Sequence, residues 1–380
     1  MCSAMVRRFA VVLCGWSAAL TAQIAAPYVP PPGAWPRTAP GELGIDAAAL
    51  AKAVALGAAG EIDAPRGMRE FQARSFGSEP HSEPIGPLFD RGGAAGAIVY
   101  RGHLVGAWGD VLRADMCNSV TKSFLTAVVG LAWQKGHIAS VHDAVAAAMP
   151  AGVDLFAGAG NQAITWDHLL RQTSDWRGTL WGKPDWADRP EGKTPEEWQN
   201  QPRHAPGSHY EYNDVRVNAL ALAALHVWRR PLPAVLRDEL MTPIGASSRW
   251  RWHGYDAAWL ELDGVKVQAS TGGGHWGGGL VIDTLDLARF GLLFARDGRW
   301  GERVVLDARW LALARTPGVA NGGYGHANWF LNLDRKAMPA APASAVRFLG
   351  NGGNVVYVDR DHDLVVVTRW VREAVFQELL

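Results

Sequence analysis

A serine and a lysine one helical turn apart are the residues of this sequence best suited to chemistry. Ser119 and Lys122 stand at the start of an apolar segment, 118–134, that is predicted to form a helix. Side chains three positions apart share one face of a helix, so the lysine can reach the serine hydroxyl. A serine becomes a nucleophile when a base removes its proton. A lysine can be that base where its environment lowers its pKa, so the pair suggests acyl transfer.

The same spacing also fits a helix cap followed by an exposed lysine. The neighbouring sequence argues against this alternative, because residues 124–131 are apolar on nearly every face of the predicted helix and are expected to be buried. A lysine one turn inside a buried helix needs a partner. Cys117, just before the pair, is expected to pack in the core rather than to act as a nucleophile.

A tyrosine and an aspartate precede a second predicted helix, 215–230. Tyr212 and Asp214 end the turn 206–214, which can present both side chains at the mouth of a helical domain. A tyrosine phenolate beside a lysine ammonium is a workable general base. The alternative is an aromatic pair packed over the helix start, with Asp214 as the N-cap of that helix.

A glycine-rich turn, 350–353, is the third feature, and it precedes a predicted strand. Glycines allow a backbone to pass close to a ligand. The backbone around Asn351 and Gly352 can therefore supply one N–H of an oxyanion hole, while the N–H of Ser119 supplies the other. A tight hairpin turn fits these glycines equally well.

Two further residues are candidates for the lining of a substrate cleft. His275 lies in the glycine-rich stretch 272–279, which is not a phosphate loop because no Gly-Lys-Ser/Thr follows it. Trp176 lies in a polar loop with other tryptophans, where an aromatic wall would suit an apolar acyl group. Simple core packing is the alternative for the tryptophan.

Composition argues against several classes of function. The 37 basic and 37 acidic residues give a net charge of zero, and no basic run occurs, which argues against nucleic acid as a partner. The 12 histidines include no His-x-x-x-His pair and have no neighbouring cysteine. We therefore expect neither a metal site nor a cofactor. The sequence leaves the oligomeric state open.

The first 22 residues have the pattern of a secretory signal. Arg7 and Arg8 precede an apolar run that ends near Ala22, and this run is short for a membrane span. A signal peptide over residues 1–22 predicts a secreted or periplasmic protein with no stable membrane insertion after its removal. An N-terminal anchor or a buried helix is the alternative.

The order of predicted elements indicates an α+β fold. Short strands are predicted near both ends of the chain, and the middle reads mostly as helices and loops. We expect an antiparallel sheet flanked by helices, built from residues 27–116 and 275–380, with an all-helical inserted domain over residues 117–274. The strands expected in the sheet are 97–100, 103–108, 324–333, 346–350, 355–359 and 364–369.

The three motifs, in this order, resemble those of the serine β-lactamase-like superfamily. That superfamily includes class C β-lactamases, penicillin-binding DD-peptidases, and related esterases and amidases. The segments 164–174 and 277–290 resemble it as well. The resemblance implies a β-lactamase/transpeptidase-like fold in which Ser119 is acylated and Lys122 and Tyr212 share the acid and base work. It also implies an oxyanion hole made by the N–H groups of Ser119 and Asn351.

The sequence departs from that pattern in two places. Asp214 stands where the superfamily usually has asparagine, and no Lys-Thr-Gly or His-Thr-Gly precedes the last strands. Because that triplet helps to hold the carboxylate of a β-lactam, its absence favours a small-molecule ester or amide as the substrate. Arg347 could substitute for the carboxylate contact, but an ordinary role as a surface arginine is the favoured alternative for it. The alternatives are a β-lactamase or DD-peptidase, and a binding or sensor protein that keeps the scaffold without turnover.

Overall fold

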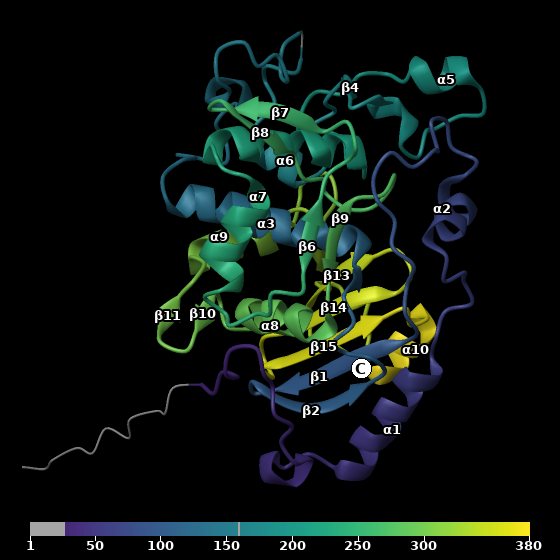
Figure 1. Cartoon of the computed structure of the whole chain (residues 1–380), viewed down its shortest axis with the longest axis vertical. Helices are drawn as coiled ribbons and strands as arrows, with labels where there is room; N and C mark the ends of the chain where they lie inside the picture. Colours follow the sequence, from purple (N-terminus) through teal and green to yellow (C-terminus); the bar gives the residue numbers. More distant parts are fainter. Residues whose placement is uncertain (1–26, 159) are drawn as a thin grey trace, which may run out of the picture.

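The computed structural model describes residues 27–158 and 160–380 (Figure 1), so the predicted signal peptide lies outside the described residues. Among the described helices, none combines the length and the apolar character that crossing a membrane requires. The strands are β1 (Ala95–Tyr100), β2 (His103–Trp108), β3 (Asp115–Met116), β4 (Thr179–Leu180), β5 (Lys183–Pro184), β6 (Arg251–His253), β7 (Trp259–Leu262), β8 (Val265–Gln268), β9 (Gly279–Ile282), β10 (Arg299–Trp300), β11 (Arg303–Val304), β12 (Phe330–Leu331), β13 (Val346–Gly350), β14 (Asn354–Asp359) and β15 (Leu364–Arg369).

Helices of several lengths connect and cover these strands. Those labelled η are short 3-10 turns, except η5, which is a π-helical turn. The helices are η1 (Pro40–Leu43), α1 (Ala47–Ala59), α2 (Met68–Phe76), η2 (Asn118–Val120), α3 (Thr121–Gln134), η3 (Val145–Ala148), α4 (Trp166–Leu170), η4 (Asp185–Ala187), α5 (Pro195–Gln199), α6 (Asp214–Trp228), α7 (Leu232–Leu236), η5 (Arg237–Met241), α8 (Thr284–Ala295), α9 (Ala308–Arg315) and α10 (Glu373–Leu379).

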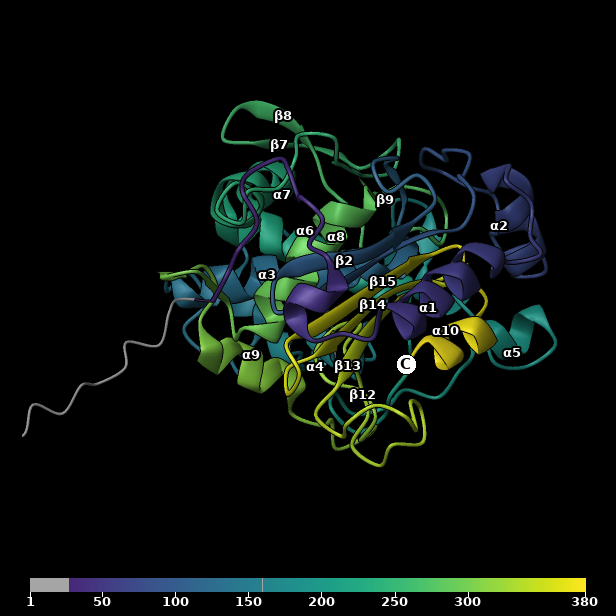
Figure 2. The same ribbon diagram turned by 90° about the horizontal axis from the view of Figure 1, so that it is seen from below.

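The main sheet joins the two ends of the chain, as the sequence predicted. Its order is β12-β13-β14-β15-β1-β2, and every neighbouring pair is antiparallel. Helix α8 packs on one face, while α1 and α10 lie on the other (Figure 2). Val365 and Val367 of β15 therefore join the core on the α8 side, and Val366 joins the core on the opposite side. Because both faces of β15 are buried, its successive side chains can all be valine.

Helix α3, which follows the Ser-Lys pair, is buried in the interior. Residues Thr121 to Ala132 are all buried. α3 contacts α6, α7 and α9, and Phe124 stacks on Phe290 of α8 with ring centroids 3.7 Å apart. This confirms the burial expected from its apolar sequence. A helix held on all sides is a rigid support for the residues at its N-terminus.

The α+β class is confirmed, with differences in detail. Most of the regular structure in the stretch 117–274 is helical, but this stretch also holds β4 to β8, so it is not all-helical as expected. β6 pairs with β9, which in turn pairs with β3, and this small sheet bridges the stretch and the N-terminal part. The strand expected over 324–333 is reduced to β12. Helix α2 has no counterpart among the predicted elements.

Candidate active site

The structure brings Ser119 and Lys122 into contact. Ser119 lies in the 3-10 turn η2, and Lys122 lies in the first turn of α3. The Nζ of Lys122 donates a hydrogen bond of 2.8 Å to the Oγ of Ser119. The shared helix face expected from the three-residue spacing is thus present, and the hydroxyl has a cationic donor beside it.

Asn118 holds the turn that carries Ser119. Its φ of 48° lies in the left-handed region, which asparagine tolerates better than most residues. Its side-chain amide donates to the backbone carbonyl of Asn351 at 2.8 Å. The residue before the nucleophile therefore ties η2 to the turn between β13 and β14, and such conformations persist only where their surroundings hold them.

Asp214 forms an ion pair with Lys122. Its Oδ1 lies 2.5 Å from the Nζ of Lys122, and the two side chains are 5% and 0% exposed. Burial lowers the pKa of Lys122, but the charges of Asp214 and Tyr212 and the hydrogen bond to Asp214 outweigh it and raise that pKa above its ordinary value. Lys122 is therefore an ammonium at neutral pH. The N-cap of α6 is Asn213, not Asp214, which is the first residue of the helix.

Tyr212 lies between two cations. The Nζ of Lys122 is 5.1 Å from the centroid of its ring, and the guanidinium carbon of Arg189 is also 5.1 Å from it. This arrangement suits a residue that gives and takes a proton beside Ser119.

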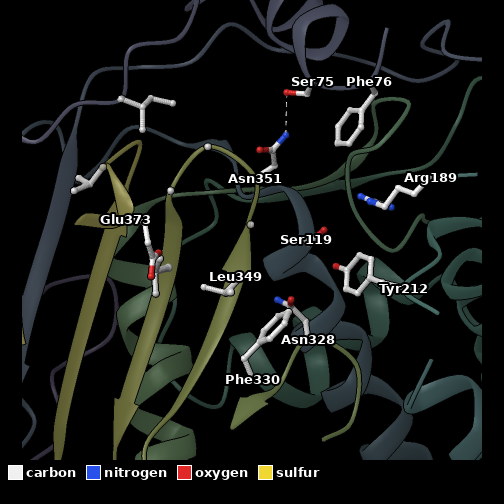
Figure 3. A pocket seen from close by; sticks show the side chains of 16 residues that line it. Ser75, Phe76, Ser119, Arg189, Tyr212, Asn328, Phe330, Leu349, Asn351 and Glu373 are labelled. Atoms are coloured by element: carbon white, nitrogen blue, oxygen red, sulfur yellow. Dashed lines mark hydrogen bonds between the residues drawn. The ribbon is translucent and has the colours of Figure 1, made fainter. Parts of the chain in front are cut away.

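A cavity of about 620 Å³ opens over these residues. Ser119, Tyr212 and Arg189 line it together with the β13–β14 turn, including Asn351 and Gly352 (Figure 3). This volume is in the range of small-molecule sites. The three motifs recognised in the sequence thus meet at one place, although they lie far apart in the chain.

The β13–β14 turn approaches the nucleophile closely. A Cβ at Gly350 would meet the carbonyl oxygen of Cys117 at 2.2 Å, so only glycine permits this contact. The carbonyl of Asn351 accepts from Asn118 and Asn354, each at 2.8 Å, and its side chain donates to Ser75. Its side chain and carbonyl are thus engaged by the protein.

The apolar wall of the cavity is formed by residues that no motif in the sequence had indicated. Phe76 at the end of α2, Phe330 of β12 and Leu349 of β13 line it (Figure 3). Trp176 does not: it is buried, and its indole N–H donates to the carbonyl of Leu155 at 2.8 Å. Its role as a cleft wall does not fit this position, and the alternative of core packing does.

His275 lies behind the site rather than in the cavity. Its Nε2 is 2.9 Å from Glu79, and its Nδ1 is 3.1 Å from Asp188 and 3.3 Å from Asp214. Burial lowers the pKa of His275, but hydrogen bonds and charges from these carboxylates outweigh it and raise that pKa to about 10. His275 is thus an imidazolium.

This cluster is a balanced set of charges. The carboxylates of Glu79, Asp188 and Asp214 face His275. Lys122 also pairs with Asp214, and Arg189 pairs with both Asp188 and Asp214. Ligand atoms of Glu79, Asp188 and His275 lie within 4.8 Å of one another, a spacing that a metal ion could use. Because three cations already compensate three carboxylates, a divalent ion would leave the buried cluster with excess positive charge.

Several of these residues had no signal in the sequence. Arg189, Asp188 and Glu79 lie in loops without a motif, and Phe76 ends a helix that was not predicted. Cys117 is buried, and burial raises the pKa of its thiol to about 11, in agreement with the packing role expected for it. Asn118 adjoins a recognised motif, and its position before a candidate nucleophile was the one available signal.

Comparison with known families assigns the chain. A family model described as β-lactamase matches residues 85–370, which is most of the chain. The chain belongs to the β-lactamase family. The expectation of a serine β-lactamase-like superfamily and its fold is thus confirmed. No curated protein sequence matches the chain.

Several solved structures share this fold. The hydrolase EstCE1, described as having promiscuous acyltransferase activity, has a TM-score of 0.56 at 16% identity and covers 87% of this chain and 97% of its own. A family VIII carboxylesterase has a TM-score of 0.55 at 17% identity, with coverage of 86% and 92%. A putative 6-aminohexanoate-dimer hydrolase from Bacillus anthracis has a TM-score of 0.53 at 15% identity, with coverage of 75% and 77%.

Proposed function

We propose that this member of the β-lactamase family is a serine hydrolase that acts on esters or amides through an acyl-enzyme at Ser119. The observation that carries the proposal is the 2.8 Å hydrogen bond between Lys122 and Ser119 at the wall of a cavity that Tyr212 also lines. A nucleophile, a proton acceptor and space for a substrate are the parts that acyl transfer needs.

In the first step, Tyr212 reacts as its phenolate and takes the proton of Ser119, while the Oγ forms a bond to the substrate carbonyl carbon. The carbonyl electron pair moves to its oxygen, and the N–H groups of Ser119 and Asn351 are proposed to stabilise that oxyanion. Lys122 stays an ammonium because of Asp214, so its role is to orient Ser119 and to balance the charge on Tyr212.

The second step releases the leaving group. The oxyanion pair returns to the carbon, the bond to the leaving group breaks, and Tyr212 gives its proton to that group. Water then attacks the acyl-enzyme, giving a proton to Tyr212, and Ser119 regains its hydrogen as the acid product leaves. The same two side chains serve in both halves of the reaction.

We propose esters or amides rather than β-lactams as substrates, because the chain lacks the Lys/His-Thr-Gly triplet. The names of EstCE1 and of the family VIII carboxylesterase support an ester. The proposal includes a signal peptide over residues 1–22, a secreted or periplasmic location, small-molecule partners and the domain boundaries expected from the sequence.

Mass spectrometry after treatment with a fluorophosphonate tests the nucleophile. We expect one adduct on wild-type protein and on Ser123→Ala, a matched change of a buried serine in α3, and none on Ser119→Ala. Turnover of p-nitrophenyl esters, nitrocefin and D-Ala peptides then ranks the substrates. Absence of acylation by any activated ester at neutral pH would refute the proposal, and fast nitrocefin turnover would favour a β-lactamase.

A binding or sensor protein is the second candidate. The ion pair of Asp214 with Lys122 favours it, since a lysine held as an ammonium leaves Tyr212 alone to act as the base that hydrolyses an acyl-enzyme. Stable labelling of Ser119 without release of product from any ester or amide is the result expected of a sensor.

A further inference from the structure

Arg189 supplies a positive charge to the cavity. Of the described residues that line the cavity, Arg189 alone has a cationic side chain, and it is 35% exposed. Its guanidinium lies between two rings, 5.4 Å from the centroid of Phe76 and 5.1 Å from that of Tyr212. Figure 3 shows its nitrogen end directed into the cavity from the side that also holds Tyr212.

One edge of the guanidinium is engaged and the other is free. Its Nη1 donates to the carboxylate of Asp188 and, at 3.4 Å, to Asp214. Among the residues that the structure describes, none accepts a hydrogen bond from its Nε or Nη2. These two nitrogens carry parallel N–H groups, the geometry that binds both oxygens of a carboxylate.

The opposite end of the cavity has a different character. Glu373 lines it there, and its carboxylate lies 2.6 Å from Arg347 (Figure 3). Arg347, the residue expected from the sequence as a possible carboxylate contact, is therefore already paired with Glu373. A substrate that reaches Ser119 with an anionic group therefore meets its attractive partner at Arg189, because the charges of Glu373 and Arg347 compensate each other.

We infer that Arg189 binds the carboxylate of an anionic ester or amide substrate through Nε and Nη2. This inference rests on the proposed function, because it concerns the substrate of the Ser119 site. The guanidinium lies beside the rings of Phe76 and Tyr212, and the bonds from its Nη1 to Asp188 and Asp214 hold its orientation. A preorganised, partly desolvated guanidinium binds a carboxylate more strongly than a mobile surface arginine does.

Two matched pairs of substrates test this inference. In 4-acetoxybenzoate and its methyl ester, the carboxylate lies on the leaving group. In the mono-4-nitrophenyl ester of adipic acid and the methyl ester of that compound, it lies on the acyl group. We expect wild-type kcat/KM to favour the anion in at least one pair. The ratio of anionic to neutral kcat/KM cancels any effect of a variant on the chemical step.

Arg189→Met is expected to lower that ratio by about 10- to 100-fold, the loss of a charge-assisted contact. Arg189→Lys keeps the charge without the paired N–H groups and is expected to give a smaller loss. Arg347→Lys replaces the other arginine near the cavity, keeps a cation beside Glu373, and is expected to leave the ratio unchanged. An unchanged ratio in Arg189→Met and Arg189→Lys, a loss in Arg347→Lys alone, or a wild-type preference for both neutral esters overturns the inference.

A binding measurement separates this inference from the proposed function. Adipate is titrated by calorimetry into Ser119→Ala and into Ser119→Ala with Arg189→Met, so no turnover is needed. We expect binding to the first and at least about tenfold weaker binding to the second. Equal affinities contradict the anion site, whereas failure of wild-type protein to be acylated contradicts the proposed function alone.

Discussion

Three side chains around Ser119 depend on one another's charges. Lys122 donates to Ser119, Asp214 holds Lys122 as an ammonium, and Tyr212 lies beside both Lys122 and Arg189. In the proposed mechanism, Asp214 sets the division of work between the other two side chains. Lys122 keeps its proton because of Asp214, and Tyr212 is left to accept the proton of Ser119.

Replacing Tyr212 tests, at the residue scale, whether this side chain accepts the proton of Ser119. Tyr212→Phe removes the proposed base and is expected to lower the rate of Ser119 acylation by about 100-fold or more. Pre-steady-state release of p-nitrophenol measures this rate. Tyr210→Phe is the matched control, since Tyr210 packs against Tyr324 and does not line the cavity. Equal acylation rates in wild type and Tyr212→Phe would assign the base to another group.

The pH profile of Asp214→Asn tests the role of Lys122. The carboxylate raises the pKa of Lys122, and its removal leaves burial, which lowers that pKa. Lys122 then loses its proton at lower pH, and Tyr212 loses one of its two cations. We therefore expect the alkaline fall of kcat/KM to begin at lower pH than in wild type. If instead the acid side of the profile moves to lower pH and activity rises, the neutral amine is the base.

At the scale of elements, the site depends on how closely β13 approaches η2. Gly350 lies against the carbonyl of Cys117, and Asn118 bonds the carbonyl of Asn351 across the same gap. β12 pairs only with Val346 and Arg347 of β13, so the end of β13 near Gly350 has a free edge toward the nucleophile.

Gly350→Ala tests this close approach. The added Cβ must displace β13 or the turn of Ser119, so we expect a loss of about 1 to 3 kcal/mol in the free energy of unfolding. Displacement of reacting groups is expected to lower kcat about 100-fold. Gly322→Ala is the control, because a Cβ there meets nothing within 4 Å. Chemical denaturation and ester hydrolysis measure both effects, and wild-type values for Gly350→Ala would contradict the argument.

At the scale of the whole molecule, one buried arginine joins the parts around the site. Arg369 of β15 donates to Asn354 of β14 at 2.7 Å, to Ile282 of β9 at 2.8 Å and to Met116 of β3 at 3.1 Å. These bonds hold the main sheet against the small sheet just before Cys117. The position of Ser119 relative to the β13–β14 turn therefore rests on this residue.

Arg369→Lys tests that connection. A lysine cannot make all three bonds in this geometry, and buried acceptors left unpaired cost free energy. We expect unfolding free energy to fall by about 2 to 4 kcal/mol and kcat to fall with it. Arg309→Lys, at an exposed ion pair with Asp307, is the control and is expected to change little. Stability equal to wild type in Arg369→Lys would show that the sheets are held together by other contacts.

The sequence by itself determined what depends on neighbours along the chain. The three-residue spacing of Ser119 and Lys122, the apolar α3 and the valine-rich β14 and β15 follow local rules of periodicity and burial, and each was predicted. The α+β class followed from the order of those elements.

Only the tertiary structure decided which distant side chains meet. It placed Asp214 on Lys122 and brought Arg189 and Phe76 into the cavity, and it buried Trp176 in the core. Such contacts join loops that are far apart in the sequence and follow no periodic pattern. Their partners are set by packing and by the compensation of buried charge, which are properties of the folded chain as a whole.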